Sequence, residues 1–242
     1  MRAQTEPLGA ALVGVATRRL LIVNPNSSAE VSRLIHKTAL SVLPQGVAAR
    51  VIQPATGPLA IQTLADRRIA EPLALDLLAA HADHDAYVMA CFDDIALEQA
   101  RRFLQVPVVG AVEASVAMAR LFARRFAVVT TVESAIPGIC SVLEGLGAAG
   151  QCSVRAAGVG VTEAADGGAS GAARIDDAIE LARNIDGAQA IILGSAGLTG
   201  RAAQLARRHR IVVIDAMEAA VRLAVAAIGV AGPAPQSIAE RR

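Results

Sequence analysis

The chain has few aromatic residues and no excess of positive or negative charge. Both features argue against one class of partner, nucleic acids. Aromatic residues make up 2% of its 242 residues, whereas hydrophobic residues make up 54%. We therefore expect a core of Ala, Val, Leu and Ile in which helices pack on strands, which argues against disorder. The 23 Lys and Arg residues are balanced by 22 Asp and Glu residues. Without a basic stripe or aromatic side chains to stack on bases, no nucleic acid partner is expected.

Cysteine and long apolar runs are also scarce. Cys91, Cys140 and Cys152 form no Cys-x-x-Cys pattern and do not cluster with the four histidines, so neither a disulfide framework nor a metal site is predicted. No apolar run reaches the roughly 18 residues that a membrane span requires. The apolar stretch 8–16 lacks the order of a signal peptide. These absences predict a cytoplasmic protein, and its Ala-rich helices favour a homo-oligomer. The small-molecule substrate expected as its partner is inferred from the strand ends and motifs described below.

Strand-like apolar runs alternate along the chain with stretches that carry apolar residues at i, i+3 and i+4 spacing. This alternation predicts an α/β fold with parallel sheets covered by helices on both faces. The expected strands span residues 19–23, 48–53, 86–89, 106–110, 126–130, 153–158, 190–193 and 211–214. The expected helices include residues 29–43, 71–80, 112–122, 175–184 and 216–228.

The sequence is internally duplicated. Residues 108–119 (VVGAVEASVAMA) align with residues 213–224 (VIDAMEAAVRLA) at an offset of 105, with six identities in twelve positions. Residues 20–28 align with 126–134 at an offset of 106, and Cys91 aligns with Ser195 at an offset of 104. Registers that agree this closely predict two pseudo-symmetric doubly wound halves with an active site in the cleft between them.

The duplication also predicts where each half begins and ends. The first half is expected to span residues 19–120, with the last helix, residues 216–228, packed back on it. The second half is expected to span residues 121–215. Residues 1–18 and 229–242 are expected to be flexible ends.

Small polar residues follow four of the expected strands, two in each half. Ligands of parallel sheets bind beyond the carboxyl ends of the strands, so these residues are candidates for a site. A thiol ahead of a helix N-terminus lies near positive backbone dipoles, which would lower the pKa of Cys91. Backbone N–H groups after each nucleophile, such as those of Phe92 and Ala196, would hold an oxygen that gains negative charge. The strand-end residues are Asn24 to Ser28, Cys91, Thr130 with Thr131, and Ser195.

Each of these residues also has a purely structural interpretation. A cysteine at the end of a strand, such as Cys91, is often a small buried hydrophobic residue, and Ser195 suits a turn. Asn24 and Asn26 suit a cap of the helix that begins near Ser28, and Ser27 or Ser28 suits this role better, because Asn and Ser side chains satisfy first-turn N–H groups. Thr130 and its neighbour are β-branched residues suited to a strand.

Several of these motifs resemble those of the aspartate/glutamate racemase superfamily, and specifically its hydantoin and allantoin racemase branch. The resemblance covers roughly residues 19–228. It implies cofactor-independent racemisation with two cysteines on opposite faces of the substrate carbon. One thiolate removes the α-proton while the opposite thiol delivers a proton to the other face. The motifs are Val23-Asn-Pro-Asn-Ser-Ser28, Ala90-Cys-Phe-Asp-Asp94, Val128-Val-Thr-Thr131, Ile192-Leu-Gly-Ser-Ala-Gly197 and Val213-Ile-Asp215.

Carried onto this chain, the resemblance implies a substrate such as a 5-substituted hydantoin or allantoin. Cys91 becomes one acid/base, and Ser195 stands where the second cysteine is expected. Thr131 joins the predicted substrate pocket through its position next to Thr130. The resemblance places the remaining contacts of that pocket at Asn24, Phe92, Thr130 and Ala196.

The chain departs from the pattern of this branch in two places. Residues 57–62 are Gly-Pro-Leu-Ala-Ile-Gln where relatives tend to have Gly-Pro-x-Ser-Ile-Glu, which leaves substrate contacts from this loop open. Ser195 is the larger departure, because a hydroxyl is a far weaker acid than a thiol and no histidine is placed to act as its base. Three hypotheses follow: a racemase whose second cysteine has been replaced, a decarboxylase of a malonate-type substrate that uses Cys91 alone, and a small-molecule binding protein without turnover.

Overall fold

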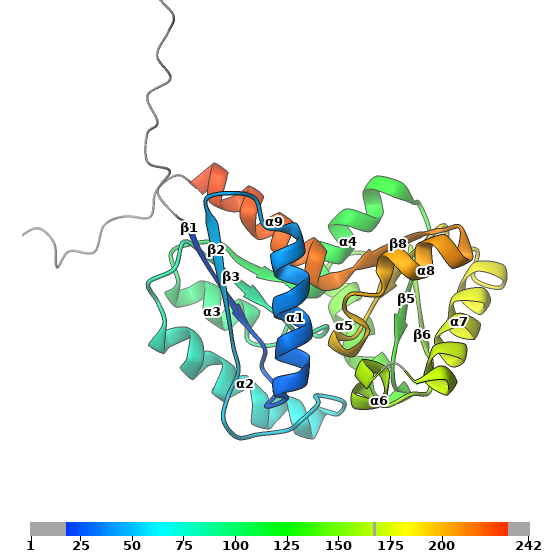
Figure 1. The fold of residues 1–242 in the computed structure, drawn as a ribbon, viewed down its shortest axis with the longest axis horizontal. Helices are drawn as coiled ribbons and strands as arrows, with labels where there is room; N and C mark the ends of the chain where they lie inside the picture. Colours follow the sequence, from blue (N-terminus) through cyan, green and yellow to red (C-terminus); the bar gives the residue numbers. More distant parts are fainter. Residues whose placement is uncertain (1–17, 167, 232–242) are drawn as a thin grey trace, which may run out of the picture.

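The structure, a computed structural model, describes residues 18–166 and 168–231, which form two parallel four-stranded sheets (Figure 1). The strand order is β2-β1-β3-β4 in the first sheet and β6-β5-β7-β8 in the second. The two orders are the same when the strands of each sheet are counted from its own first strand. The predicted fold of two similar α/β halves with parallel sheets is confirmed.

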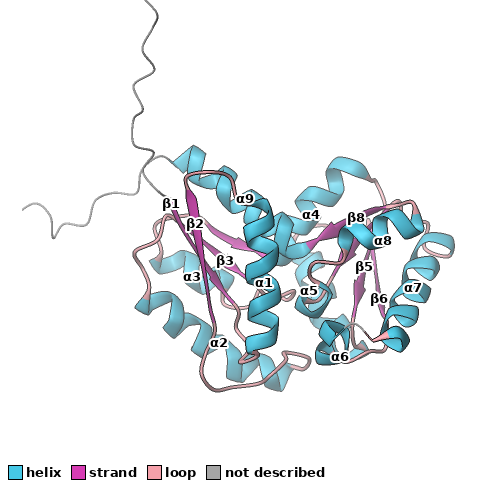
Figure 2. Ribbon diagram, viewed as in Figure 1, coloured by secondary structure: helices cyan, strands magenta, loops and turns pink. Residues whose placement is uncertain are grey.

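The elements follow the predicted order, with two 3-10 helices (η) in the second half (Figure 2). The first group is β1 (Arg18–Val23), α1 (Ala29–Val42), β2 (Val47–Ile52), α2 (Leu64–Ala80), β3 (Ala86–Met89), α3 (Leu97–Phe103), β4 (Val108–Gly110) and α4 (Ala111–Phe122). The second group is β5 (Phe126–Thr130), η1 (Glu133–Ala135), α5 (Ile136–Gly145), β6 (Cys152–Ala156), α6 (Val161–Asp166), α7 (Ala169–Asn184), β7 (Ala190–Leu193), η2 (Ala196–Leu198), α8 (Ala202–His209), β8 (Val212–Asp215) and α9 (Ala216–Ala231).

The observed bounds differ from the predicted ones mainly at helix starts. Three strands have the predicted ends, and the other five shift by one or two residues. Helix α2 begins seven residues earlier than predicted, because Thr63 and Asp66 form a capping box ahead of it. Arg18 belongs to β1 and residues 229–231 extend α9, so the predicted flexible ends are wrong there. The remainder of both predicted ends, residues 1–17 and 232–242, lies outside the described residues.

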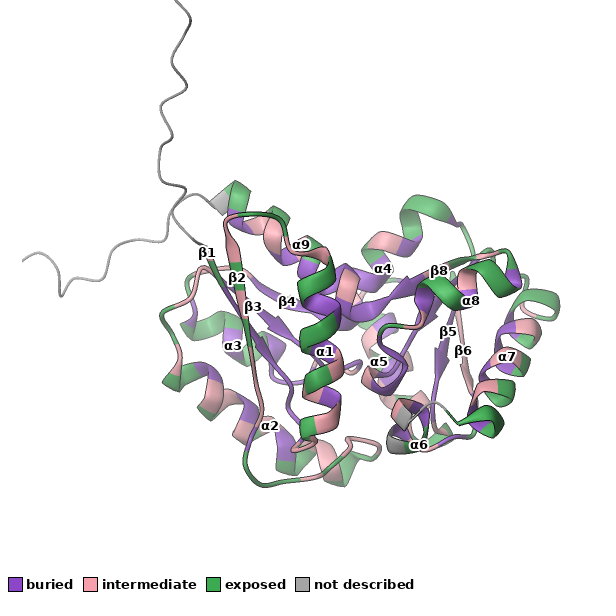
Figure 3. Cartoon of the chain, in the orientation of Figure 1, coloured by how far each residue is buried: buried purple, intermediate pink, exposed green. Residues whose placement is uncertain are grey.

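Side chains alternate along the central strands between a shared inner core and two outer cores. In β1, Leu20 and Ile22 face the inner core, whereas Leu21 faces the outer core formed with α2 and α3. In β5, Val128 faces the inner core and Val129 faces the outer core formed with α7 and α8. Figure 3 shows the central strands buried between more exposed helices. No helix in the described part of the chain is long and apolar enough to cross a membrane.

Helices α4 and α9 cross between the two halves. Helix α4 follows the last strand of the first sheet but contacts β7 and β8 of the second. Helix α9 follows the last strand of the second sheet and contacts β3, β4 and α1 of the first, and the two helices pack against each other (Figure 1). The predicted division near residues 120 and 121 stays a prediction, because α4 contacts both sheets.

The N-termini of α4 and α9 are capped by carboxylates that come from different places in the chain. In α9, Oδ1 of Asp215, the last residue of β8, accepts hydrogen bonds from the second and third N–H groups of the helix at 2.9 and 3.3 Å. The equivalent position before α4 is Gly110. There Asp94 accepts from the second and third N–H groups at 2.9 and 3.0 Å. A Cβ atom on Gly110 would lie 2.5 Å from Cγ of Asp94, so the glycine makes room for the borrowed carboxylate.

We predict that Gly110→Ala lowers the free energy of unfolding by about 1–3 kcal/mol, the usual cost of overpacking a tight site. The added methyl displaces Asp94 from the N–H groups it caps. Urea unfolding measures the loss. Gly229→Ala is the matched control, because nothing lies within 4 Å of the added Cβ in α9, and it is expected to gain about 0.5–1 kcal/mol. Equal stability of Gly110→Ala and the parent protein would contradict the close approach.

Candidate active site

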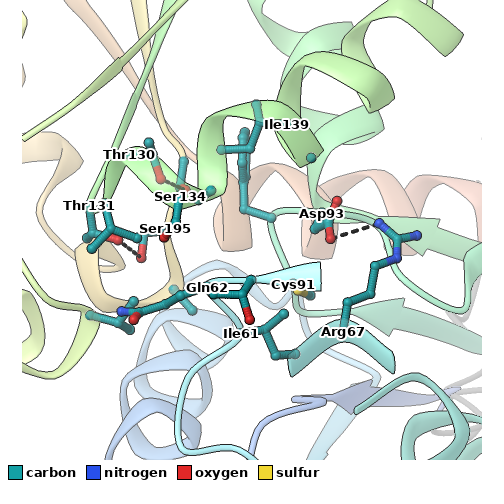
Figure 4. A pocket seen from close by; sticks show the side chains of 18 of the residues that line it. Ile61, Gln62, Arg67, Cys91, Asp93, Thr130, Thr131, Ser134, Ile139 and Ser195 are labelled. Atoms are coloured by element: carbon teal, nitrogen blue, oxygen red, sulfur yellow. Dashed lines mark hydrogen bonds and ion pairs between the residues drawn. The ribbon is translucent and has the colours of Figure 1, made fainter. Parts of the chain in front are cut away.

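A cavity of about 820 Å³ lies beyond the carboxyl ends of strands from both sheets. Its walls come from the turn after β3, the loop before α2, the ends of β5 and β7, and the start of α5. The structure therefore brings six of the seven predicted site residues to one place, as Figure 4 shows for several of them. These six are Cys91, Phe92, Thr130, Thr131, Ser195 and Ala196.

Asn24, the seventh predicted site residue, does not line the cavity. Its side chain is buried, and its Nδ2 donates to Oδ1 of Asn26 and to Oγ of Ser32, both at 3.0 Å. The backbone N–H of Asn26 in turn donates to Oδ1 of Asn24 at 3.3 Å. Asn26 is the residue of this loop that reaches the cavity wall. The prediction for Asn24 therefore requires correction, since its amide is used to hold the loop. Ser28 caps α1, as one structural interpretation predicted.

Cys91 lies two residues beyond the end of β3 and does not directly precede a helix. A turn follows it, closed by a hydrogen bond of 3.1 Å from the Asp94 N–H to the Cys91 carbonyl, and α3 begins only at Leu97. The expected help from a helix dipole is therefore missing. Burial raises the pKa of Cys91, and the nearby carboxylates of Asp93 and Asp94 raise it further. The positive charge of Arg67 and the N–H group of Asp93 oppose this shift. The prediction of a lowered pKa is wrong for the ligand-free protein.

Ser195 is held at the end of β7 by hydrogen bonds to its hydroxyl oxygen. The Gly197 N–H donates to Ser195 Oγ at 3.3 Å, and Oγ1 of Thr131 donates to it at 3.5 Å. Oγ1 of Thr130 donates to the carbonyl of Gly194 at 3.0 Å and fastens the same turn. No histidine is among the described residues that line the cavity. The Ser195 hydroxyl thus has neighbours that donate to it and no imidazole to take its proton.

The thiol and the hydroxyl approach the cavity from opposite sheets. In Figure 4, Ser195 lies beside Thr130 and Thr131, and Cys91 lies across the cavity near Asp93.

Sequence reasoning missed an ion pair in the cavity wall next to the thiol. Arg67 in the first turns of α2 approaches Asp93 with 2.8 Å between Nη1 and Oδ2. The motif Cys-Phe-Asp-Asp already indicates a carboxylate near the thiol, because Asp93 follows Cys91 by two residues. No sequence pattern indicates Arg67, because it lies in a charged helical stretch and such side chains are usually exposed to solvent. Ile61 and Gln62 of the loop left open by the sequence also line the cavity.

The chain is similar to known proteins along most of its length. The family model of Asp/Glu/hydantoin racemases matches residues 20–224. The chain belongs to this family. A hydantoin racemase of Rhizobium meliloti is 33% identical over 211 residues, which cover 86% of this chain and 88% of that protein.

Two solved structures of the family are similar along nearly the whole chain. An allantoin racemase from Klebsiella pneumoniae is 29% identical with a TM-score of 0.85, covering 91% of each chain. An allantoin racemase from Pseudomonas fluorescens is 28% identical with the same TM-score, covering 91% of this chain and 99% of that one. Fold, family and relatives together make this protein a racemase.

We predict that Cys91 of this racemase is protonated at neutral pH when no ligand is bound. Burial raises its pKa, so the thiolate is expected to form only above the ordinary range of cysteine. The ultraviolet absorbance of the thiolate, followed against pH in a Cys140→Ser/Cys152→Ser background, measures the transition. Subtracting a matched Cys91→Ser protein removes the contribution of tyrosine. A transition at or below the ordinary cysteine pKa would show that burial does not dominate.

Proposed function

We propose that this racemase acts on the asymmetric carbon of a hydantoin ring, in a 5-substituted hydantoin or a related compound such as allantoin. The relatives named above are hydantoin and allantoin racemases. The position of a thiol and a hydroxyl on opposite walls of one cavity is the observation that carries the proposal. No cofactor is part of this proposal, because the chemistry needs only proton transfer at an acidic carbon.

Cys91 is the acid/base on one face of the ring. Its thiolate takes the proton from the carbon, and the electron pair moves into the adjacent carbonyl to give an enolate. Backbone donors stabilise the charge that develops on the carbonyl oxygen. We assign this role to the N–H groups of Phe92 and Ala196, because those of Asp93 and Gly197 are used on Cys91 and Ser195.

Ser195 is the group on the other face, at the position where the pattern of this branch has a second cysteine. A hydroxyl with no adjacent base is a poor proton acceptor and a slow donor. Proton removal and return at the Cys91 face therefore outpace inversion. Asn26, Thr130 and Thr131 are proposed to contact the substrate from the surrounding wall, with Asn24 holding Asn26 in place.

We predict that one enantiomer of the substrate exchanges its proton for deuterium faster than the other in heavy water. The enantiomer whose proton faces Cys91 exchanges with retention, while net racemisation is slow. Ser195→Cys is expected to raise the racemisation rate by about 10²-fold or more, because it supplies the missing acid/base. NMR follows deuterium wash-in for each enantiomer, and polarimetry follows racemisation.

Two matched variants make this experiment decisive. Ser195→Ala is expected to leave exchange at the Cys91 face in place, whereas Cys91→Ser is expected to abolish it. Racemisation by the parent protein as fast as by Ser195→Cys would contradict the limited role of Ser195. Release of carbon dioxide from a malonate would indicate the single-cysteine decarboxylase instead. Tight binding without exchange, even in Ser195→Cys, would leave a binding protein.

The cytoplasmic location and the homo-oligomeric state predicted from the sequence stay predictions. Size-exclusion chromatography with light scattering determines the second of these directly.

A further inference from the structure

One cation and one anion stand in the cavity wall beside the thiol. Among the described residues that line the cavity, Arg67 is the basic one and Asp93 the acidic one. Their ion pair measures 2.8 Å, and Asp93 follows Cys91 by two residues. Figure 4 shows Arg67 reaching toward Asp93 on the side of the cavity that carries Cys91.

We propose that Arg67 controls the charge state of Cys91 by neutralising Asp93, and so sets how readily Cys91 takes and returns the substrate proton. The inference rests on the acid/base role proposed for Cys91. It makes Arg67 and Asp93 positioning residues, which act through the thiol and need no contact with the reacting carbon.

Asp93 depends on Arg67 because its carboxylate has little other support. Its Oδ2 pairs with Arg67, while its Oδ1 is buried with no hydrogen-bond partner among the described residues. A Cβ atom on Gly138 of α5 would lie 3.1 Å from this Oδ1, so the second half covers it closely. Burial raises the pKa of Asp93, and Arg67 opposes the rise. Removal of Arg67 would leave a buried, unpaired charge, the costly outcome of breaking such a pair.

Asp94, the other carboxylate near the thiol, has different partners. Its two oxygens accept from the N–H groups at the start of α4, so the helix terminus shares its charge. Asp93 Oδ1, by contrast, accepts no hydrogen bond from any described residue, although it lies close to Gly138 in the first turn of α5. Of the two carboxylates that disfavour the thiolate, only Asp93 is therefore governed by a side chain of α2.

The Arg67–Asp93 pair is partly shielded from solvent, so its charges act on the neighbouring thiol. The side chains of Arg67 and Asp93 are 30% and 18% exposed, so solvent screens their fields only in part. The capping box at Thr63 fixes the start of α2, and the Arg67 N–H donates to the Thr63 carbonyl at 3.0 Å. Arg67 thus extends from a well-defined helical turn.

The charged groups around the thiol come from the first half alone. Cys91 is influenced by Asp93 and Asp94 from its own turn and by Arg67 from α2. Glu71, one turn further along α2, acts on Asp93. The second half contributes no charged side chain among the described residues of the cavity wall. The equilibrium between the thiol and the thiolate of Cys91 therefore depends on the pairing of Arg67 with Asp93.

The test is a thiolate titration of the whole protein without substrate, in the Cys140→Ser/Cys152→Ser background. Arg67→Gln is expected to move thiolate formation to higher pH and to lower the thiolate fraction about tenfold at a given pH below the transition, a shift of about one pKa unit. Asp93→Asn is expected to move it to lower pH. Arg67→Lys is expected to stay near the parent protein, because it keeps the charge.

The double variant Arg67→Gln/Asp93→Asn separates charge from packing. Its titration is expected to lie below that of Arg67→Gln, because the carboxylate that Arg67 neutralised is gone. Arg68→Gln removes a charge from the next residue of α2, which is exposed and outside the cavity wall, and is expected to change nothing. If Arg67→Gln does not fold, the thiolate titration of Asp93→Asn alone still tests the proposal.

Unchanged titrations in Arg67→Gln, or in Asp93→Asn where Arg67→Gln does not fold, would overturn the proposal. So would a double variant no different from Arg67→Gln. The pH profile of deuterium wash-in should shift with the thiolate titration. Shifted titrations with no exchange by any variant would instead refute the proposed reaction and leave the charge control standing.

Discussion

The crossing of α4 and α9 between the two sheets is the constraint on which the rest of the structure depends. Each helix follows a strand of one sheet and packs on the other, and the two pack against each other in the inner core. The inner core thus belongs to both halves, and neither sheet can bury its inner face without a helix from the other. The cavity inherits this arrangement, because its two walls are strand ends that the shared core holds opposite each other.

The chemistry of the cavity is uneven despite the symmetry of its frame. On the first-sheet side stand a thiol, a carboxylate and a guanidinium. On the second-sheet side stand hydroxyls that hydrogen-bond to one another and to the backbone. Burying a charged side chain costs free energy unless an opposite charge or hydrogen bonds stabilise it. Asp93 therefore needs an ion pair with Arg67, whereas the hydroxyls on the second-sheet side need only neutral hydrogen-bond partners. The duplicated fold supplies two equivalent positions, and the side chains around them differ in charge and in hydrogen-bond partners.

The sequence predicts the parts of this structure that depend on local pattern. Buried parallel strands such as Ala86–Met89 stand out as short apolar runs, and the internal repeat pairs Cys91 with Ser195. Contacts made over a distance are not predicted. Nothing local shows that Arg67 reaches Asp93, that α4 covers the second sheet, or that Asn24 turns inward while Asn26 reaches the cavity. The prediction of a lowered pKa for Cys91 is wrong for the same reason. It assumed a helix directly after Cys91, whereas the structure has a turn there and buries the thiol.

The carboxylate that Asp94 lends to the start of α4 couples two distant positions of the chain. Two related helices have a carboxyl group at the equivalent point of their N-termini, one from Asp215 and the other from Asp94. The two carboxyl groups thus take the same place at the helix start although they come from different positions of the two halves. A side chain at position 110 is therefore compatible with this fold only if residue 94 changes as well. Divergence of the turn that carries the thiol is tied in this way to a residue at the end of a different strand.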